Sequence, residues 1–159
     1  MKRIVIILLS FGAWGCTEQI EPTPLTYTKL LSGESSKAWI MTAYQIREKD
    51  KPTISVPVPF GPEDACVFDD QYVFSANEER SFTINEGASK CDPNDPDIFI
   101  TDNWSMVNAT ATLNFVVPIL FSGSLPFTVH KLTEKQLEVD FFFEEFSSYR
   151  FIFKHVENE

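Results

Sequence analysis

Apolar and polar residues alternate with a period of two through most of the chain after Gly33, and this pattern restricts the fold more than any other feature. In segment 136–143, every second residue is apolar, namely Leu137, Val139, Phe141 and Phe143. Successive side chains of a β-strand point to opposite faces, so the pattern predicts strands with one face on a core and the other in water. No long segment after Gly33 has the 3.6-residue period of a helix.

Segments of this kind recur along the chain, separated by polar or proline-containing turns. We predict strands at 37–47, 71–75, 81–85, 98–106, 111–117, 119–121, 125–132, 136–143 and 149–156. Segment 51–62 contains four prolines, which predicts a loop or a weak edge strand, because proline cannot donate to a strand ladder.

A short helical pattern precedes these strands, with Tyr27, Leu30 and Leu31 on one side and Gly33 placed to end the helix. About eight strands joined by short turns favour an up-and-down meander, and closure of such a meander removes its exposed edges. The sequence therefore predicts an all-β, antiparallel, up-and-down β-barrel of about eight strands with a short N-terminal helix.

The first residues indicate export. Met1, Lys2 and Arg3 form a short cationic start, and the segment that follows, 4–14, is almost entirely apolar. This is the layout of a secretory signal, and the apolar stretch is shorter than the roughly 20 residues that a membrane-spanning helix needs. We expect residues 1–15 to be a signal peptide.

The end of this segment, Ala13-Trp14-Gly15-Cys16, resembles a bacterial lipobox. The resemblance implies that Cys16 is acylated after cleavage at Gly15 and anchors the mature chain to a membrane, with 16–24 as lipidated cysteine and tether and 25–159 as the folded domain. By resemblance to lipoprotein sorting, Glu18 favours the outer membrane, on its periplasmic face or at the cell surface. The alternative is an ordinary signal peptide in which Cys16 has no role.

The charge of the mature chain limits its partners. The 13 basic residues of the sequence, less Lys2 and Arg3, leave 11 against 23 acidic ones, a formal charge of −12. Such a domain repels nucleic acid and anionic lipid headgroups, so we expect no nucleic-acid partner and no peripheral adhesion to membranes. No protein partner can be named from the charge.

Two cysteines remain besides Cys16, namely Cys66 and Cys91. An even number of cysteines in an oxidising compartment predicts a disulfide between them. A metal site would need further ligands, and His130 and His155 lie far away in the sequence without ligand spacing.

No constellation of residues predicts an enzyme. The chain has no glycine-rich phosphate loop, no nucleophile elbow and no zinc-binding histidine pair. Adjacent carboxylates such as Asp69 and Asp70 point to opposite faces of a strand, so they make no acid–base pair by themselves. The acidic loop 92–97 could supply calcium ligands, but its residue types are also those of plain turns. We therefore expect no catalytic residues, no cofactor and no metal.

Several motifs together resemble a known family. They are Cys66-Val-Phe-Asp-Asp-Gln-Tyr-Val-Phe74, Lys90-Cys-Asp-Pro93, Trp104-Ser105 and Leu132-Thr-Glu-Lys-Gln-Leu137, with Trp39 on the first strand and Leu30-Leu31 in the opening helix. In this arrangement the chain is similar, from Leu25 to its C-terminus, to the lipocalin-like domain of bacterial envelope lipoproteins. The resemblance implies a barrel of lipocalin type.

Barrels of about eight strands either fill their interior with side chains or hold one small ligand. Our candidates for inward, ligand-lining positions are Trp39, Met41, Phe74, Phe82, Trp104, Phe115, Phe127 and Phe141. The leading hypothesis is a barrel that binds a small apolar or amphipathic ligand. The alternative is a structural or protein-interaction module with a filled core, favoured by the proline-rich segment 51–62 and by Phe142 on an otherwise acidic strand face.

Overall fold

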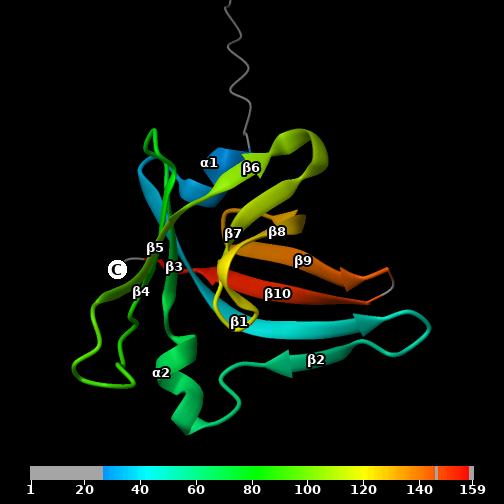
Figure 1. The fold of residues 1–159 in the computed structure, drawn as a ribbon, viewed down its shortest axis with the longest axis horizontal. Helices are drawn as coiled ribbons and strands as arrows, with labels where there is room; N and C mark the ends of the chain where they lie inside the picture. The colour runs from blue at the N-terminus through cyan, green and yellow to red at the C-terminus, as the bar shows by residue number, and fades with distance from the viewer. Residues whose placement is uncertain (1–26, 146, 158–159) are drawn as a thin grey trace, which may run out of the picture.

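The computed structural model describes residues 27–145 and 147–157, and most of them belong to β-strands (Figure 1). The elements, in chain order, are α1 (Tyr27–Ser32), β1 (Ser36–Glu48), β2 (Ile54–Pro57), the 3₁₀ turn η1 (Pro62–Asp64), α2 (Ala65–Phe68), β3 (Gln71–Ser75), β4 (Ser81–Asn85), β5 (Ile98–Asn103), β6 (Ser105–Val107), the 3₁₀ turn η2 (Asn108–Thr110), β7 (Thr112–Val117), β8 (Phe121–Leu132), β9 (Gln136–Glu144) and β10 (Ser147–His155).

All strands belong to one antiparallel sheet that curls into a nearly closed barrel. Its order is β5-β4-β3-β1-β10-β9-β8-β7-β6, with β2 paired to β1 beside this path. The two terminal strands of the order, β5 and β6, are separated in the chain only by Trp104, so one continuous segment passes from one end of the sheet to the other. The predicted antiparallel barrel is therefore confirmed, with a near up-and-down order.

The strands differ from the prediction in segments 98–106 and 119–121. Segment 98–106 divides into β5 and β6 because Trp104 turns inward, where it is 2% exposed and its indole N–H donates to the Ser75 carbonyl oxygen at 2.9 Å. The proline-rich segment, predicted to be a loop or a weak edge strand, contributes the short edge strand β2, and the described residues then form ten strands. A separate strand at 119–121 is wrong, because Leu120 N–H donates to the Val117 carbonyl oxygen at 2.9 Å and closes a turn there, and Phe121 is the first residue of β8.

The opening helix is present as predicted. Gly33 has a φ of +66°, which a glycine adopts without strain, and its N–H donates to the Lys29 carbonyl oxygen at 2.9 Å to end α1. Leu31 is fully buried, and the carbonyl oxygen of Leu31 accepts a hydrogen bond from the Trp39 indole at 2.9 Å. These contacts fix α1 over one end of the barrel.

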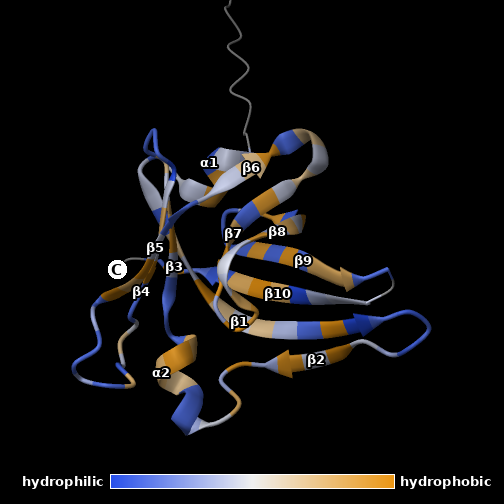
Figure 2. Ribbon diagram, in the orientation of Figure 1, coloured by the Kyte–Doolittle hydropathy of each residue, from blue (hydrophilic) through white to orange (hydrophobic). Residues whose placement is uncertain are grey.

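Aromatic rings fill the interior at this end. The ring centroids of Phe74 and Phe82 lie 5.0 Å apart, and those of Phe115 and Phe127 lie 4.7 Å apart, within the range of favourable aromatic pairs. Figure 2 shows the alternation that produces this core as bands of opposite hydropathy along β9 and β10. The inward residues of neighbouring strands therefore meet in one packed cluster.

Strand β1 bends in its middle, and its two halves pair with different strands. Its first half pairs with β3 from Ser36 to Trp39, and its second half pairs with β2 from Ala43 to Ile46. Its ladder to β10 is irregular between Met41 and Ala43, and such irregularities bend a strand. The barrel therefore opens between β2 and β3, at the end opposite α1, where η1 and α2 lie (Figure 1).

Candidate ligand-binding site at the open end of the barrel

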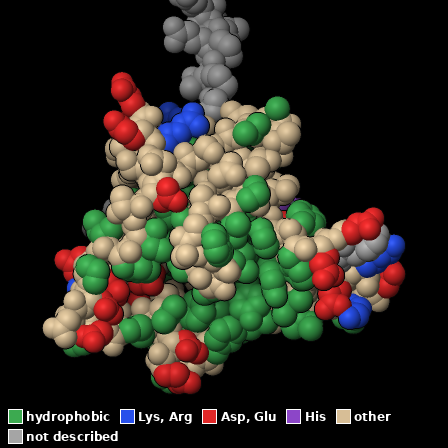
Figure 3. Space-filling model, viewed as in Figure 1, with side chains coloured by type: hydrophobic (Ala, Val, Ile, Leu, Met, Phe, Trp, Pro, Cys, Tyr) green, Lys and Arg blue, Asp and Glu red, His purple; other side chains and the backbone are tan. Residues whose placement is uncertain are grey.

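An apolar pocket of about 240 Å³ lies at this open end. Its walls are the side chains of Tyr44, Phe60, Phe68, Ile119, Leu120, Tyr149 and Phe151. Figure 3 shows apolar side chains gathered on the surface here, between α2 and the strands beside it. We call this cavity the mouth pocket.

The segment before η1 supplies the rim residue Phe60. Val58 N–H donates to the Thr42 carbonyl oxygen at 3.2 Å, which holds the segment against the bend of β1. The Phe60 ring then meets Tyr44 and Phe68 edge to face, at centroid distances of 5.9 and 5.6 Å. Phe60 nevertheless remains 56% exposed, so part of its side chain is available to another molecule.

The turn between β7 and β8 supplies the opposite rim. Val117 and Leu120 close this turn, with Pro118 at its second position, where the fixed φ of proline is favourable. Turn positions are commonly occupied by Gly, Asn, Asp or Ser, but here Ile119 occupies the tip and is 46% exposed. Its side chain lines the mouth pocket.

A second, smaller cavity of about 70 Å³ adjoins the mouth pocket and shares Phe68 and Ile119 with it. We call it the inner pocket. Its lining is Met41, Val67, Phe68, Asp70, Tyr72, Phe99, Pro118 and Ile119. Asp70 brings a carboxyl group into this otherwise largely apolar lining.

The environment of Asp70 is unusual for a carboxyl group. The residue is 7% exposed, and its Oδ1 atom has no hydrogen-bond partner among the residues that the structure describes. Burial raises the pKa of Asp70 to about 7, the negative charges of Glu86 and Asp69 act in the same direction, and a hydrogen bond from the Gly87 backbone opposes them. Burial, together with Asp70, also raises the pKa of the neighbouring Tyr72.

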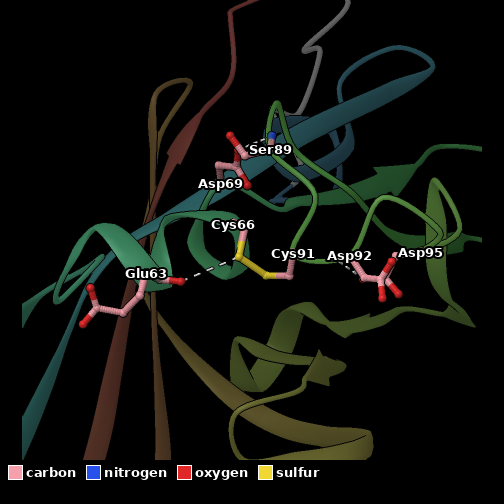
Figure 4. The surroundings of a disulfide bond; sticks show 7 residues. All are labelled: Glu63, Cys66, Asp69, Ser89, Cys91, Asp92 and Asp95. Atoms are coloured by element: carbon pink, nitrogen blue, oxygen red, sulfur yellow. Dashed lines mark hydrogen bonds between the residues drawn. A yellow bond between two sulfur atoms is a disulfide. The ribbon is translucent and has the colours of Figure 1, made fainter.

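The disulfide between Cys66 and Cys91 is present, as predicted, with 5.2 Å between the two Cα atoms (Figure 4). It ties α2 to the long connection between β4 and β5. In the same region, Asp69 Oδ2 accepts a hydrogen bond from Ser89 N–H at 2.8 Å. A Cβ atom at Gly87 would lie 2.3 Å from the Asp69 carbonyl oxygen, so this close approach requires glycine. These links position Phe68 and Asp70 at the two pockets.

Most of the residues predicted to line a cavity lie elsewhere in the barrel. Met41 lines the inner pocket, and Phe141 is half-buried against the core. The others are at most 2% exposed, pack in the core and line neither pocket, namely Trp39, Phe74, Phe82, Trp104, Phe115 and Phe127. Their predicted inward orientation is therefore present, while their contact with a ligand stays a prediction.

The residues of the mouth pocket were not among the sequence candidates. Tyr44, Tyr149 and Phe151 belong to strands, where they resemble any other inward aromatic residue. Phe60 and Ile119 carried a usable signal, because each is a large apolar residue beside proline in a turn or loop. The helix α2 was not predicted at all, since four residues are too few to show a period.

Carboxylate oxygen atoms of the acidic loop 92–97 accept hydrogen bonds from the loop itself and from the preceding Lys90. Asp92 Oδ1 accepts hydrogen bonds from the backbone and side chain of Asn94, and Asp97 pairs with Lys90 at 2.6 Å. Among the described residues, no group of three or more His, Cys, Asp or Glu side chains is arranged to hold a metal ion.

The predicted signal peptide, the lipidation site Cys16 and the tether lie outside the described residues. Within residues 27–145 and 147–157, no helix has the length and apolarity needed to cross a membrane. Comparison with protein-family models gave no match for the chain, and comparison with the curated proteins gave none either. Function must therefore be argued from the pockets themselves.

Proposed function

We propose that this chain is an exported, lipid-anchored, non-enzymatic barrel protein of the cell envelope that binds a small apolar or amphipathic ligand in the mouth pocket. The observation that carries the proposal is the pocket itself. Aromatic and aliphatic side chains surround it, and they come from β1, the segment before η1, α2, the β7–β8 turn and β10. Large contiguous apolar patches on a protein surface mark interaction sites or ligand-binding grooves, whereas single exposed apolar residues are normal.

The size of the site limits the ligand. The mouth pocket and the inner pocket have volumes of about 240 and 70 Å³. Together they reach the lower end of the roughly 300–1,000 Å³ that is usual for small-molecule sites. A single alkyl chain or a small ring system fits this space better than a lipid with two acyl chains.

The position of the site agrees with anchoring through the N-terminus. Figure 1 shows α1, the first described element, at the end of the barrel away from α2. An anchor attached before Tyr27 would therefore join the barrel at the end opposite the mouth pocket. The pocket would remain open to the surrounding solution, from which a ligand could enter.

The alternative function is a protein-interaction module, and the filled interior supports it. Six of the eight candidate lining residues are packed against one another, so the barrel has no deep central cavity in that region. In this case the mouth pocket would receive an apolar side chain of a protein partner. The two functions differ in whether a free small molecule binds.

Thermal denaturation of the purified protein in the presence of hexanol, octanol and decanol tests the ligand-binding proposal. Each buried methylene contributes about 0.8 kcal/mol, so affinity should rise about fourfold per added carbon until the pocket is full. A ligand at 100 times its Kd adds about 2.7 kcal/mol of stability. Stabilisation that does not depend on chain length, or no stabilisation at all, would favour the protein-interaction module.

Two matched variants locate the binding. Phe60→Ser removes a rim residue that is 56% exposed, and Phe142→Ser removes a residue that is 58% exposed and does not line either pocket. We expect Phe60→Ser to weaken decanol binding at least tenfold and Phe142→Ser to leave it unchanged. Equal effects of the two variants would place the binding elsewhere.

A further inference from the structure

The apolar lining of the mouth pocket continues beyond it on the same face of the sheet. Tyr44, which lines the mouth pocket, and Ile46 are two residues apart on β1, so their side chains point to the same face. Ile46 lines a further pocket of about 240 Å³ beside the β1–β2 hairpin. We call it the hairpin pocket, and its lining is Ile46, Glu48, Lys51, Pro52 and Ile54.

Apolar side chains cross four strands at the level of Ile46. Its cross-strand neighbours are Ile54 of β2 on one side and Tyr149 of β10 on the other. Tyr149 in turn lies opposite Phe141 of β9. We call these four residues the apolar row. Phe143, on the same face of β9 as Phe141, stacks on Tyr149 with 4.9 Å between the ring centroids. Ile54 and Phe143 remain 57% and 44% exposed, so this face of the sheet is open to another molecule.

The two ends of this surface differ in chemistry. The mouth pocket at one end is lined by aromatic and aliphatic side chains. At the other end, Glu48 and Lys51 form an ion pair at the hairpin pocket. From Tyr44 to Glu48 the path along β1 is about 14 Å, at about 3.4 Å per residue. Such a surface matches a molecule with an apolar chain at one end and a polar headgroup at the other.

The size of the surface also fits a slender molecule. The mouth pocket and the hairpin pocket each measure about 240 Å³, so the two together lie within the roughly 300–1,000 Å³ of small-molecule sites. A protein partner that adds a strand is disfavoured, because the outer edge of β2 contains Pro57, which has no N–H to donate. A second copy is disfavoured by the formal net charge of −10, since two such chains repel each other.

We infer that the ligand is a long single-chain amphiphile, whose chain runs from the mouth pocket along β1 over the apolar row and whose headgroup lies at Glu48 and Lys51. This inference rests on the proposed function, because it extends the same site and names the class of ligand. A methylene group in an enclosed pocket raises affinity about fourfold, and one that lies on an open face buries about half of its surface and raises affinity about twofold. Affinity should therefore keep rising with chain length after the mouth pocket is full.

The test is calorimetric titration of the purified full-length protein with octyl, decyl, dodecyl and tetradecyl maltoside, each below its aggregation concentration. These compounds share one uncharged headgroup, so only the length of the chain changes. The variants are Ile54→Ser and Phe143→Ser. The matched control is Phe142→Ser, because Phe142 is 58% exposed and lies next to Phe143 on the opposite face of β9. Thermal denaturation checks that each variant is folded, and the length series of the unmodified protein needs no variant.

We expect tetradecyl maltoside to bind at least tenfold more tightly than decyl maltoside. Ile54→Ser and Phe143→Ser should each weaken tetradecyl maltoside binding at least fivefold and change octyl maltoside binding less than twofold, and Phe142→Ser should change neither.

Equal affinity for decyl and tetradecyl maltoside, or equal effects of Phe143→Ser and Phe142→Ser, overturns the inference and leaves the proposed function standing. A dimer in analytical ultracentrifugation that Ile54→Ser and Phe143→Ser dissociate overturns it as well, because the apolar row then contacts a second copy. Binding of none of the four compounds overturns both the inference and the proposed function.

Discussion

Single residues in the interior of the barrel carry much of its stability. Phe82 and Phe127 are at most 1% exposed and contact other aromatic rings, with Phe82 next to Phe74 at 5.0 Å and Phe127 next to Phe115 at 4.7 Å. Such side chains fill a close-packed interior, and their removal leaves a void that the surroundings only partly close.

Phe82→Ala and Phe127→Ala should therefore each lower the free energy of unfolding by about 3–5 kcal/mol. Phe141 is only partly buried at the edge of the same core, so Phe141→Ala should cost clearly less. Chemical denaturation measures all three variants. Losses of less than about 1 kcal/mol for Phe82→Ala and Phe127→Ala would show that the interior is not filled in solution.

Asp70 connects the stability of the barrel to pH. Its pKa rises from 3.8 to about 7 on folding, because burial and the charges of Glu86 and Asp69 disfavour the ionised form. The folded state thus holds its proton more tightly than the unfolded state. The resulting stabilisation is fully present below about pH 4 and is lost as the pH rises to 7, at a rate of about 1.4 kcal/mol per pH unit.

The variant Asp70→Asn should remove this contribution. In the unmodified protein, Asp70 should make the free energy of unfolding lower at pH 8 than at pH 4 by on the order of 4 kcal/mol. In Asp70→Asn this contribution to the pH dependence should be absent. Urea denaturation at the two pH values measures the effect, and Glu63→Gln controls for the change in net charge. An identical pH dependence of Asp70→Asn and the unmodified protein would contradict a raised pKa.

Among the elements, α2 depends most on a covalent link. It has four residues, which is too short for a helix to be stable in isolation, and the Cys66–Cys91 disulfide ties it to the β4–β5 connection. Phe68 of α2 lines both pockets, so the position of this helix decides the shape of the site.

Replacing both cysteines by serine should lower the free energy of unfolding by roughly 3–4 kcal/mol, the chain-entropy value for closing a loop of this length. The loss of α2 from its place should also weaken decanol binding. Denaturation and calorimetric titration measure the two effects. Unchanged ligand affinity in the doubly substituted protein would show that α2 keeps its position without the disulfide.

At the scale of the whole molecule, α1, the first described element, and the mouth pocket lie at different ends of the barrel. Residues before Tyr27 lead into α1, while the mouth pocket lies beside α2 (Figure 1). Several acyl chains on Cys16 would hold the protein firmly on a membrane, where one chain alone is marginal.

Cys16→Ser should therefore release the protein from the membrane fraction and leave decanol binding unchanged, because Cys16 is not among the residues that line the mouth pocket. Cell fractionation and calorimetric titration of the released protein measure this. If the Cys16→Ser protein fractionates with membranes as the unmodified protein does, the anchor assignment is wrong.

Features encoded by neighbouring residues could be determined from the sequence alone. Alternation identified β3 and β4 to the residue and placed Leu137 and Val139 of β9 on the buried face, because the strand period is a property of consecutive residues. Gly33 marked the end of α1, and a single pair of cysteines left one disulfide to form.

Only the tertiary structure decided where the interior is filled and where it is open. Whether Phe82 or Phe151 meets another ring or borders a pocket depends on which strands lie opposite it. The mouth pocket joins Tyr44, Phe60, Ile119 and Tyr149, which are far apart in the chain and meet because β1 bends and leaves a gap between β2 and β3. Local patterns carry no information about such distant contacts, so Asp70 could be recognised as a site residue only once the barrel had formed around it.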